Sequence, residues 1–184
     1  MANPAISRAQ VHALAEACSD EGEAFQSTAA RLVREQRRVS RFVEQNVAPM
    51  GPMAGQVALY MLTVCLRIVE QVGGRLNKVS GRELDAASAR VNAAVEQLMP
   101  ADDTFHERAR AIEWRAQPHL LDEILWALYE RDDKKEEEVD VDHEQSALIY
   151  ILLWAAVEAV DAKWRAPADF DPDAFQAPEE AGEE

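Results

Sequence analysis

The sequence predicts an all-α protein, a single-domain helical bundle of about five to seven helices with an acidic C-terminal tail. Two segments, 51–72 and 147–164, are apolar around most of the helix circumference, and such helices must be covered by others. Apolar residues elsewhere recur at intervals of three, four and seven, and no segment alternates as a strand does. With 7 Gly among 184 residues, the composition favours helices. We expect residues 1–165 to form the bundle and residues 166–184 a Pro-rich, flexible, disordered tail.

The first expected element is one long helix from about Ser7 to Val47. Its apolar residues stay on one helical face through the whole stretch. Asp20 and Glu23 resemble a capping pair, and Gly22 between them lowers helix propensity. We therefore expect this helix to be bent or interrupted there.

The central element is the helix from Gly51 to Val72, with Pro52 in its first turn and Gly73 after its end. Its polar residues follow steps of three and four, which places them on one narrow stripe: Gln56, Tyr60, Thr63, Arg67 and Glu70. The other faces are expected in the core. The last helix, from about residue 143 to 164, is the expected packing partner.

The same central segment has the composition of a membrane span, since no charged residue occurs between Glu44 and Arg67. Pro49 and Pro52 interrupt this window and leave about 15 residues, roughly 22 Å of helix. A hydrocarbon layer is roughly 30 Å thick. The last helix is judged too short as well, because Glu158 and Asp161 shorten its apolar part. We therefore expect buried helices and no membrane contact.

Between these two apolar helices, the sequence marks further helix boundaries. Ser80 and Glu83 have the spacing of a capping box, and Pro100 ends the helix that follows. A fourth helix is expected from Asp102 or Asp103 to about residue 117. Pro118 then either kinks this helix or begins another.

Charge is distributed unevenly along the chain. Residues 1–120 contain 14 acidic and 14 basic residues, whereas residues 121–184 contain 20 and 5, so the net charge of -15 falls in the last third. Part of this excess lies in the polar stretch 132–144, which is expected as a solvated connection. Such an asymmetry indicates an interaction surface or a solubilising tail.

Motifs for catalysis or metal binding are missing from the sequence. It contains no Gly-x-Ser-x-Gly turn and no glycine-rich phosphate loop. It also lacks any Glu-x-x-His pair, which a di-metal helical bundle requires. We expect no metal, no cofactor and a non-enzymatic role, although spacing alone leaves open a triad assembled from distant residues.

The two cysteines, Cys18 and Cys65, fall within apolar helical stripes. Buried free thiols are therefore expected rather than a disulfide. Free thiols fit a reducing compartment, and the N-terminal residues have neither a basic leader nor a long apolar segment. These observations favour a cytoplasmic location.

A basic stripe is the main nucleic-acid signal in the sequence. It comprises five arginines at helical spacing, namely Arg31, Arg34, Arg37, Arg38 and Arg41. Arginine suits phosphate because its guanidinium donates two hydrogen bonds at once. The net charge of -15 opposes a polyanion, so pairing with Glu35, Glu44 or the chain's own acidic segments is the favoured interpretation.

Arg67 and Glu158 are the notable charges within the two most apolar helices. They would either form a buried pair lining a polar pocket between those helices or lie at a thin exposed edge. Tyr150 and Trp154 share a face with Glu158. That face is a contact surface if it points outward, and otherwise these aromatics belong to the core.

The acidic tail contains two aromatic residues, Phe170 and Phe175. Aromatic rings among acids form a plausible docking peptide, because the rings supply apolar area and the acids steer the peptide to a basic rim. Alternatively, the rings dock on the protein's own surface, or the tail only solvates the protein.

Taken together, these features favour a helical protein–protein interaction module, such as an adaptor, regulatory or assembly protein. Its acidic last third is the expected contact region, and the first helix could supply the seam of a homodimer. A small-ligand or metal-binding bundle with a pocket near Arg67 and Glu158 is the alternative. Nucleic-acid contact through the stripe from Arg31 to Arg41 is a third hypothesis, and is not favoured.

Overall fold

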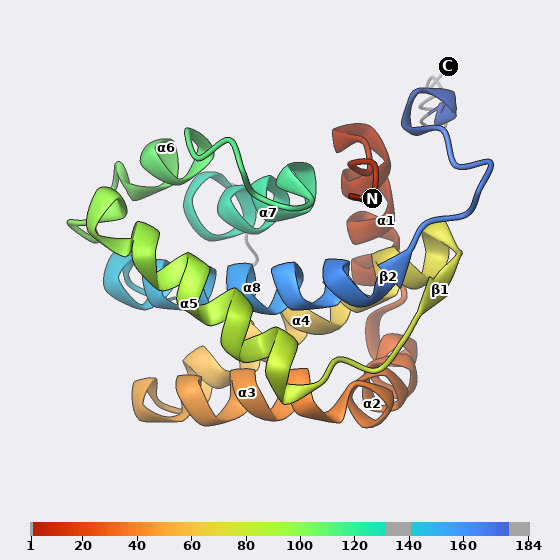
Figure 1. The fold of residues 1–184 in the computed structure, drawn as a ribbon. Coiled ribbons are helices and arrows are strands. Elements are labelled where there is room, and N and C mark those ends of the chain that lie inside the picture. The colour runs from red at the N-terminus through yellow and green to blue at the C-terminus, as the bar shows by residue number, and fades with distance from the viewer. Residues whose placement is uncertain (1, 132–140, 177–184) are drawn as a thin grey trace, which may run out of the picture.

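The computed structural model describes residues 2–131 and 141–176, and this part of the chain is mostly helical, as the sequence predicts (Figure 1). The α-helices are α1 (Arg8–Asp20), α2 (Phe25–Glu35), α3 (Arg37–Val47), α4 (Pro52–Val72), α5 (Gly81–Leu98), α6 (Phe105–Arg110), α7 (Pro118–Leu125) and α8 (His143–Lys163). Short 3-10 turns lie at Gly22–Ala24, Ala48–Met50 and Pro172–Ala174, and a π-helical turn, η3, at Trp126–Glu130.

Two apolar helices, α4 and α8, pack against each other at the centre of the fold. Helix α4 is covered by α1, α2 and α3, and α8 by α3, α5 and α7. Figure 1 shows α8 across the middle of the molecule, between α7 above and α3 below. This arrangement confirms that the helix after Gly51 packs on the last helix, because two helices that are apolar on most faces bury each other.

Helix boundaries set by caps agree with the sequence. Ser80 and Glu83 form the expected capping box at the start of α5, and Asp142 forms another with Gln145 at the start of α8. Pro52 is the first residue of α4, where a missing N–H costs little. These boundaries depend on residues near in sequence, so local spacing is enough to locate them.

The prediction of one long N-terminal helix with a single interruption is wrong in one respect, because the helix breaks twice. The first break, at residues 21–24, is where the sequence predicts it. The second is at Gln36, whose φ of -110° and ψ of 54° separate α2 from α3. Its side-chain amide donates to the carbonyl oxygen of Asn77 at 3.1 Å and accepts from the N–H of Val79 at 3.1 Å. A tertiary contact therefore sets this break, and the helical periodicity does not reveal it.

The helix expected to run to about residue 117 ends at Arg110 instead. Residues 111–117 form an irregular strap that leads to α7, which begins at Pro118. The strap ends in Gln117, a non-glycine residue with a positive φ of 50°. Its side chain accepts from the N–H of Ile6 at 2.9 Å and donates to the carbonyl of Pro4 at 3.0 Å. These buried hydrogen bonds to the N-terminal segment compensate for the unfavourable backbone conformation.

The expectation that no strand occurs is also wrong, because two strands of two residues form an antiparallel pair. β1 (Arg75–Leu76) pairs with β2 (Trp164–Arg165), with Leu76 opposite Trp164. A two-residue strand is too short to show an alternating pattern. Gly74 precedes β1 with φ 81°, and a Cβ there would lie 2.1 Å from the carbonyl oxygen of Arg165. Only glycine allows this close approach of the two backbones.

The length argument against a membrane span does not hold for this structure. Both α4 and α8 contain 21 residues, or about 31 Å each at 1.5 Å per residue. By length and composition alone, both could cross a membrane. In the structure, 44% of the most apolar window of α4 and 67% of that of α8 is buried. Their apolar character is that of the two central helices of the bundle.

The N-terminal segment is bonded to the C-terminal end of α8 and to the residues just after it. Asn3 donates to the carbonyl of Trp164 at 2.8 Å and to that of Asp161 at 3.0 Å, and it accepts from the N–H of Ala166 at 3.2 Å. Residues 166–176 of the predicted tail therefore begin on the bundle itself. The remainder of that tail, 177–184, and most of the predicted acidic connection, 132–140, lie outside the described residues.

Replacing Gln36 should loosen the packing of the 77–79 loop on α2 and α3. The Gln36→Ala variant leaves the buried N–H of Val79 and the carbonyl of Asn77 without this partner, which should lower the free energy of unfolding by about 1–3 kcal/mol. Urea unfolding followed by circular dichroism measures the change. Gln45→Ala, at an exposed position of α3, is the control and should change stability by less than about 0.5 kcal/mol. Equal effects in the two variants would contradict the role assigned to Gln36.

Candidate binding groove

An open groove of about 750 Å³ lies between α1, α4, α7 and the π-helical turn η3. Helix α4 forms its floor, the C-terminal half of α1 forms one wall, and α7 with η3 forms the other. Figure 1 shows α1 and α7 next to each other on the same side of α4. The groove thus lies where three helices meet and no fourth helix closes the gap among the described residues.

The floor of the groove is apolar. Val57, Met61, Val64 and Ile68 recur at steps of three and four along α4 and therefore share one face of this helix. Ile124 and Leu128 continue the apolar surface on the opposite wall. Val57 and Met61 are half-buried, so part of this surface is accessible from the groove. Such a surface favours an apolar ligand or side chain.

The rim along α1 is acidic. Glu16 and Asp20 are exposed and lie one helical turn apart. Glu123 faces them from α7, where it is buried and forms an ion pair with Arg8 and a 3.0 Å contact with the Nδ1 atom of His12. The Nε2 atom of His12 lies 3.0 Å from Glu16. The carboxyl group of Glu123 is thus already partnered, whereas Asp20 has no ion pair within the described residues.

The far wall ends in the π-helical turn η3. The N–H of Arg131 donates to the carbonyl of Trp126 at 2.9 Å, the five-residue spacing of a π-helix. A π turn rotates the following side chains relative to an α-helix and often occurs at functional sites. Here it places Trp126 and Ala127 at the groove, with the ring of Trp126 edge-on to His12 at 5.2 Å.

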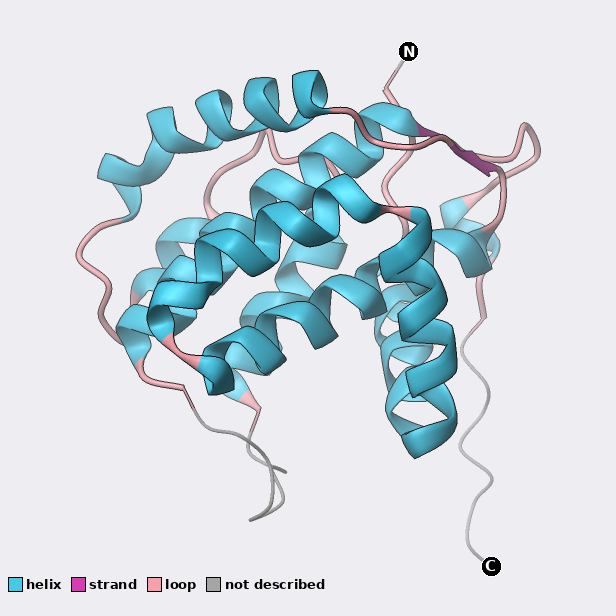
Figure 2. Cartoon of the chain, turned by 90° about the horizontal axis from the view of Figure 1, so that it is seen from below, coloured by secondary structure: helices cyan, strands magenta, loops and turns pink. Residues whose placement is uncertain are grey.

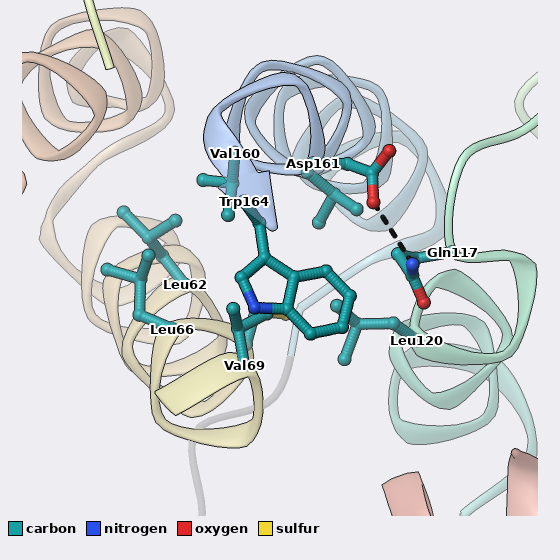
Figure 3. Close-up of a pocket in the computed structure, with 10 residues that line it drawn as sticks. Leu62, Leu66, Val69, Gln117, Leu120, Val160, Asp161 and Trp164 are labelled. Atoms are coloured by element: carbon teal, nitrogen blue, oxygen red, sulfur yellow. Dashed lines mark hydrogen bonds between the residues drawn. The ribbon is translucent and has the colours of Figure 1, made fainter. Parts of the chain in front are cut away.

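A second space, enclosed between α4, α7 and α8, has a volume of only about 10 Å³ (Figure 3). Figure 3 shows the indole of Trp164 among Leu62, Leu66 and Leu120, with the hydrogen bond from Gln117 to Asp161 at one side. Such a volume has room for about one water molecule. The bundle is therefore filled at this junction, and the space is too small for a metabolite.

Arg67 and Glu158 line neither of these spaces. Arg67 lies on the partly exposed edge of α4, where its Nη1 donates to Glu70 at 2.9 Å. Glu158 is buried, and one of its oxygens accepts from the indole N–H of Trp154 and from the backbone N–H of Ala116, both at 2.9 Å. Glu158 therefore holds the 111–117 strap onto α8.

Tyr150 and Trp154 are both fully buried in the core. The hydroxyl of Tyr150 lies 3.4 Å from the guanidinium of Arg115, which also donates to Asp122 at 2.8 Å. Burial raises the pKa of Tyr150 to about 12, although the nearby Arg115 charge lowers it. The ring of Trp154 packs against that of the half-exposed Trp114, with 4.9 Å between ring centroids and 34° between the ring planes. These aromatics are thus core residues that anchor the strap.

The arginine stripe is divided between α2 and α3. Arg31 donates to Glu35 at 3.1 Å and to Glu70 at 2.8 Å, and these carboxylates raise its pKa. The other four arginines, Arg34, Arg37, Arg38 and Arg41, are exposed. None of these four has an acidic partner within 4.0 Å in the part of the chain that the structure describes. Pairing with neighbouring acids therefore applies to Arg31 and not to the remainder of the stripe.

The two tail aromatics differ in their surroundings. The ring of Phe170 is half-buried and lies edge-on to Trp164, with 6.3 Å between ring centroids. It thus packs on the edge of the protein's own core. Phe175 is half-buried and follows the 3-10 turn at Pro172–Ala174.

No metal-binding cluster of three or more His, Cys, Asp or Glu occurs within residues 2–131 and 141–176.

Sequence analysis missed the groove and its far wall. The sequence indicates the apolar face of α4 but not which helices leave it uncovered, and no local signal marks the π turn. Of the polar stripe on α4, Gln56 and Tyr60 line the groove. No family model matches the chain, and no curated protein or solved structure matches it either.

Replacing Glu158 should destabilise the strap. In the Glu158→Leu variant, the buried N–H groups of Trp154 and Ala116 lose their acceptor, which should lower the free energy of unfolding by about 2–4 kcal/mol. Glu158→Gln keeps an accepting oxygen and should cost about 1 kcal/mol. Urea unfolding monitored by tryptophan fluorescence measures both variants. If glutamine and leucine were equally destabilising, these hydrogen bonds would not be what holds the strap.

Both thiols should be unreactive in the folded protein. The structure confirms that Cys18 and Cys65 are free and buried. Burial, with Glu21 nearby, raises the pKa of Cys18 to about 11, and burial raises that of Cys65 to about 12. At pH 8, a shift from 9 to 11 lowers the thiolate fraction about 100-fold. Labelling of the folded protein with a thiol reagent should therefore be slow, and its rate should still rise between pH 8 and 10. In 6 M urea, both thiols should react at about the rate of an exposed cysteine. Cys65 lines the floor of the groove, so rapid labelling of this thiol in the folded protein at pH 8 would show that the floor opens.

Proposed function

We propose that this protein is a helical interaction module whose groove binds an amphipathic helix of a partner protein, with Lys or Arg on the polar side of that helix. The observation that carries the proposal is the apolar, three-walled groove of about 750 Å³ with an acidic rim. Helix-in-groove binding is a recurring mode of peptide recognition, in which apolar residues at i, i+3, i+4 and i+7 insert into the groove.

The shape of the groove supports a helical occupant. Its floor residues on α4, from Val57 to Ile68, lie 11 residue steps apart, which corresponds to about 16 Å of helix. An occupying helix would complete the packing that α4 already makes with α1, α2, α3 and α8. Burial of apolar surface on both partners contributes about 25 cal/mol per Å² before the cost of association.

The charge of the rim supports a basic partner. Glu16 and Asp20 lie along one wall at a spacing of four residues, which matches the i, i+4 spacing of Lys or Arg on a facing helix. Exposed charges at the edge of an interface mainly accelerate association and discourage wrong partners. An acidic partner would meet like charge at the same positions.

Site-specific photocrosslinking in the native cell tests the occupant directly. Benzoylphenylalanine in place of Val57 should crosslink a partner segment that reads as an amphipathic, Lys/Arg-containing helix. The control is Met53, which is 55% exposed on the same helix but does not line the groove. Failure to crosslink at position 57, an equal yield at position 53, or an adduct below about 1,000 Da would overturn the proposal. The last result would indicate a small molecule, which a groove of this volume can also hold.

The captured segment, made as a synthetic peptide, permits a quantitative test of the rim. Reversing both exposed acids in a Glu16→Lys/Asp20→Lys variant should weaken peptide binding about tenfold and reduce its salt dependence. Isothermal titration calorimetry at two salt concentrations measures both effects. Glu44→Lys, at an exposed position of α3 outside the groove, should leave affinity unchanged. A peptide bound equally well by the double variant would refute the role of the acidic rim.

A further inference from the structure

We propose that a second, separate surface of this protein binds the phosphate backbone of double-stranded nucleic acid without reading its sequence. The surface is a basic patch defined by six exposed residues from two parts of the chain, namely Arg34, Arg37, Arg38, Arg41, Lys78 and Arg82. It lies along α2, α3 and the start of α5, the side from which Figure 2 views the molecule. The groove is formed by other elements, so the two surfaces are independent.

Tertiary contacts bring the two parts of the patch together. Gln36, between Arg34 and Arg37, is hydrogen-bonded on either side of Lys78, to the carbonyl of Asn77 and to the N–H of Val79. The guanidinium of Arg38 reaches Gly81, with its Nη1 atom 3.4 Å from the position that a Cβ would take there. Arg82 is the next residue along α5. Lys78 and Arg82 therefore lie beside the arginines of α3 and widen a single stripe into two rows.

The cations of this patch have no acidic partner among residues 2–131 and 141–176. Within the described residues, none of the six has an acidic group within 4.0 Å. Nearby acids are engaged elsewhere: Glu35 and Glu70 with Arg31, and Glu83 with Lys163 at 3.0 Å. Glu44 and Asp85 are exposed on the same helices without forming an ion pair there. Six exposed cations without an ion pair to any described residue are a local exception in a chain of net charge -15.

The composition of the patch distinguishes among anionic partners. Among the described residues, the exposed large apolar side chains are Met53, Tyr60, Met99, Trp114 and Leu148, and none belongs to the patch. Protein interfaces rely on buried aromatic or aliphatic anchors, and single-stranded nucleic acid is bound by stacking on aromatic rings. A surface made of guanidinium and ammonium groups alone fits the phosphates of a duplex, which are bound by charge. The wedge of apolar residues that would insert into a lipid layer is also missing from this patch.

The net charge does not prevent such contact at close range. Interactions between exposed charges are largely screened beyond about 8–10 Å at physiological salt, so the distant acidic residues act weakly at the patch. They still reduce the overall attraction. Binding should therefore be weak at physiological salt and strong at low salt.

Fluorescence anisotropy with a labelled 20-base-pair DNA duplex tests the proposal on the full-length protein. Six phosphate contacts give a slope of log K against log salt of about -5, so affinity should fall about 10³-fold between 50 and 200 mM salt. The Arg38→Gln/Arg41→Gln variant should reduce the size of this slope by about two, and Lys78→Gln by about one. Asn92→Glu/Gln97→Glu changes the net charge by the same -2 at exposed positions of α5 away from the patch, and should leave the slope unchanged.

Three results would overturn the proposal. One is the lack of binding at 50 mM salt with up to about 100 μM protein, where non-specific complexes form readily. A second is a slope that the patch variants leave unchanged, or that the control variant changes equally. The third is patch-dependent binding to vesicles containing phosphatidylserine, or to polyglutamate, without binding to the duplex. Thermal unfolding of all variants by circular dichroism confirms that they are folded before the comparison is made.

Discussion

The fold depends on covering α8 on nearly all sides. Its residues from Leu153 to Val160 are all buried, including the charged Glu158, which leaves no face of this stretch for solvent. Helices cover part of this surface, and the irregular 111–117 strap contacts another part. A strap carries free backbone N–H groups, and burying them without partners would cost free energy. Glu158 supplies the acceptor for Ala116, so a buried acceptor oxygen is what allows a non-helical segment to pack on the central helix.

The charges of this protein are separated in space more than its composition suggests. The groove has acids along one rim, while the basic patch on α2, α3 and α5 has exposed cations without acidic partners among the described residues. Both surfaces rest on the same central helices, since α4 contacts α1 on one side and α2 and α3 on another. A module that holds a basic helix on one face and a polyanion on another could bring the two together. Because the groove rim is acidic and the patch is basic, each surface would also repel the ligand of the other.

Local sequence patterns predict the parts of the fold that local interactions decide. The two apolar helices, the capping box at Ser80 and the break near Gly22 depend on residues within a few positions of one another. The break at Gln36, the packing of the 111–117 strap on α8 and the β1–β2 pair depend on partners 41 to 90 positions away in the chain. The candidate sites divide in the same way. Helical spacing identifies the arginines of the patch, but Lys78 and Arg82 join them only through a tertiary contact. The groove is a face of α4 that no other helix covers among the described residues, and periodicity does not reveal such a gap.

The position of Asn3 has a consequence for the order of folding. Its side chain bonds to Asp161, Trp164 and Ala166, residues about 160 positions later, and so ties the segment before α1 to the end of α8. During synthesis, these partners leave the ribosome only after about 160 further residues have been made. The segment before α1 meets Gln117 earlier, whereas its bonds to the end of α8 close a loop of about 160 residues, which is a late and entropically costly step. This last tie therefore forms after α1, α4 and α7, the helices that enclose the groove, have all left the ribosome.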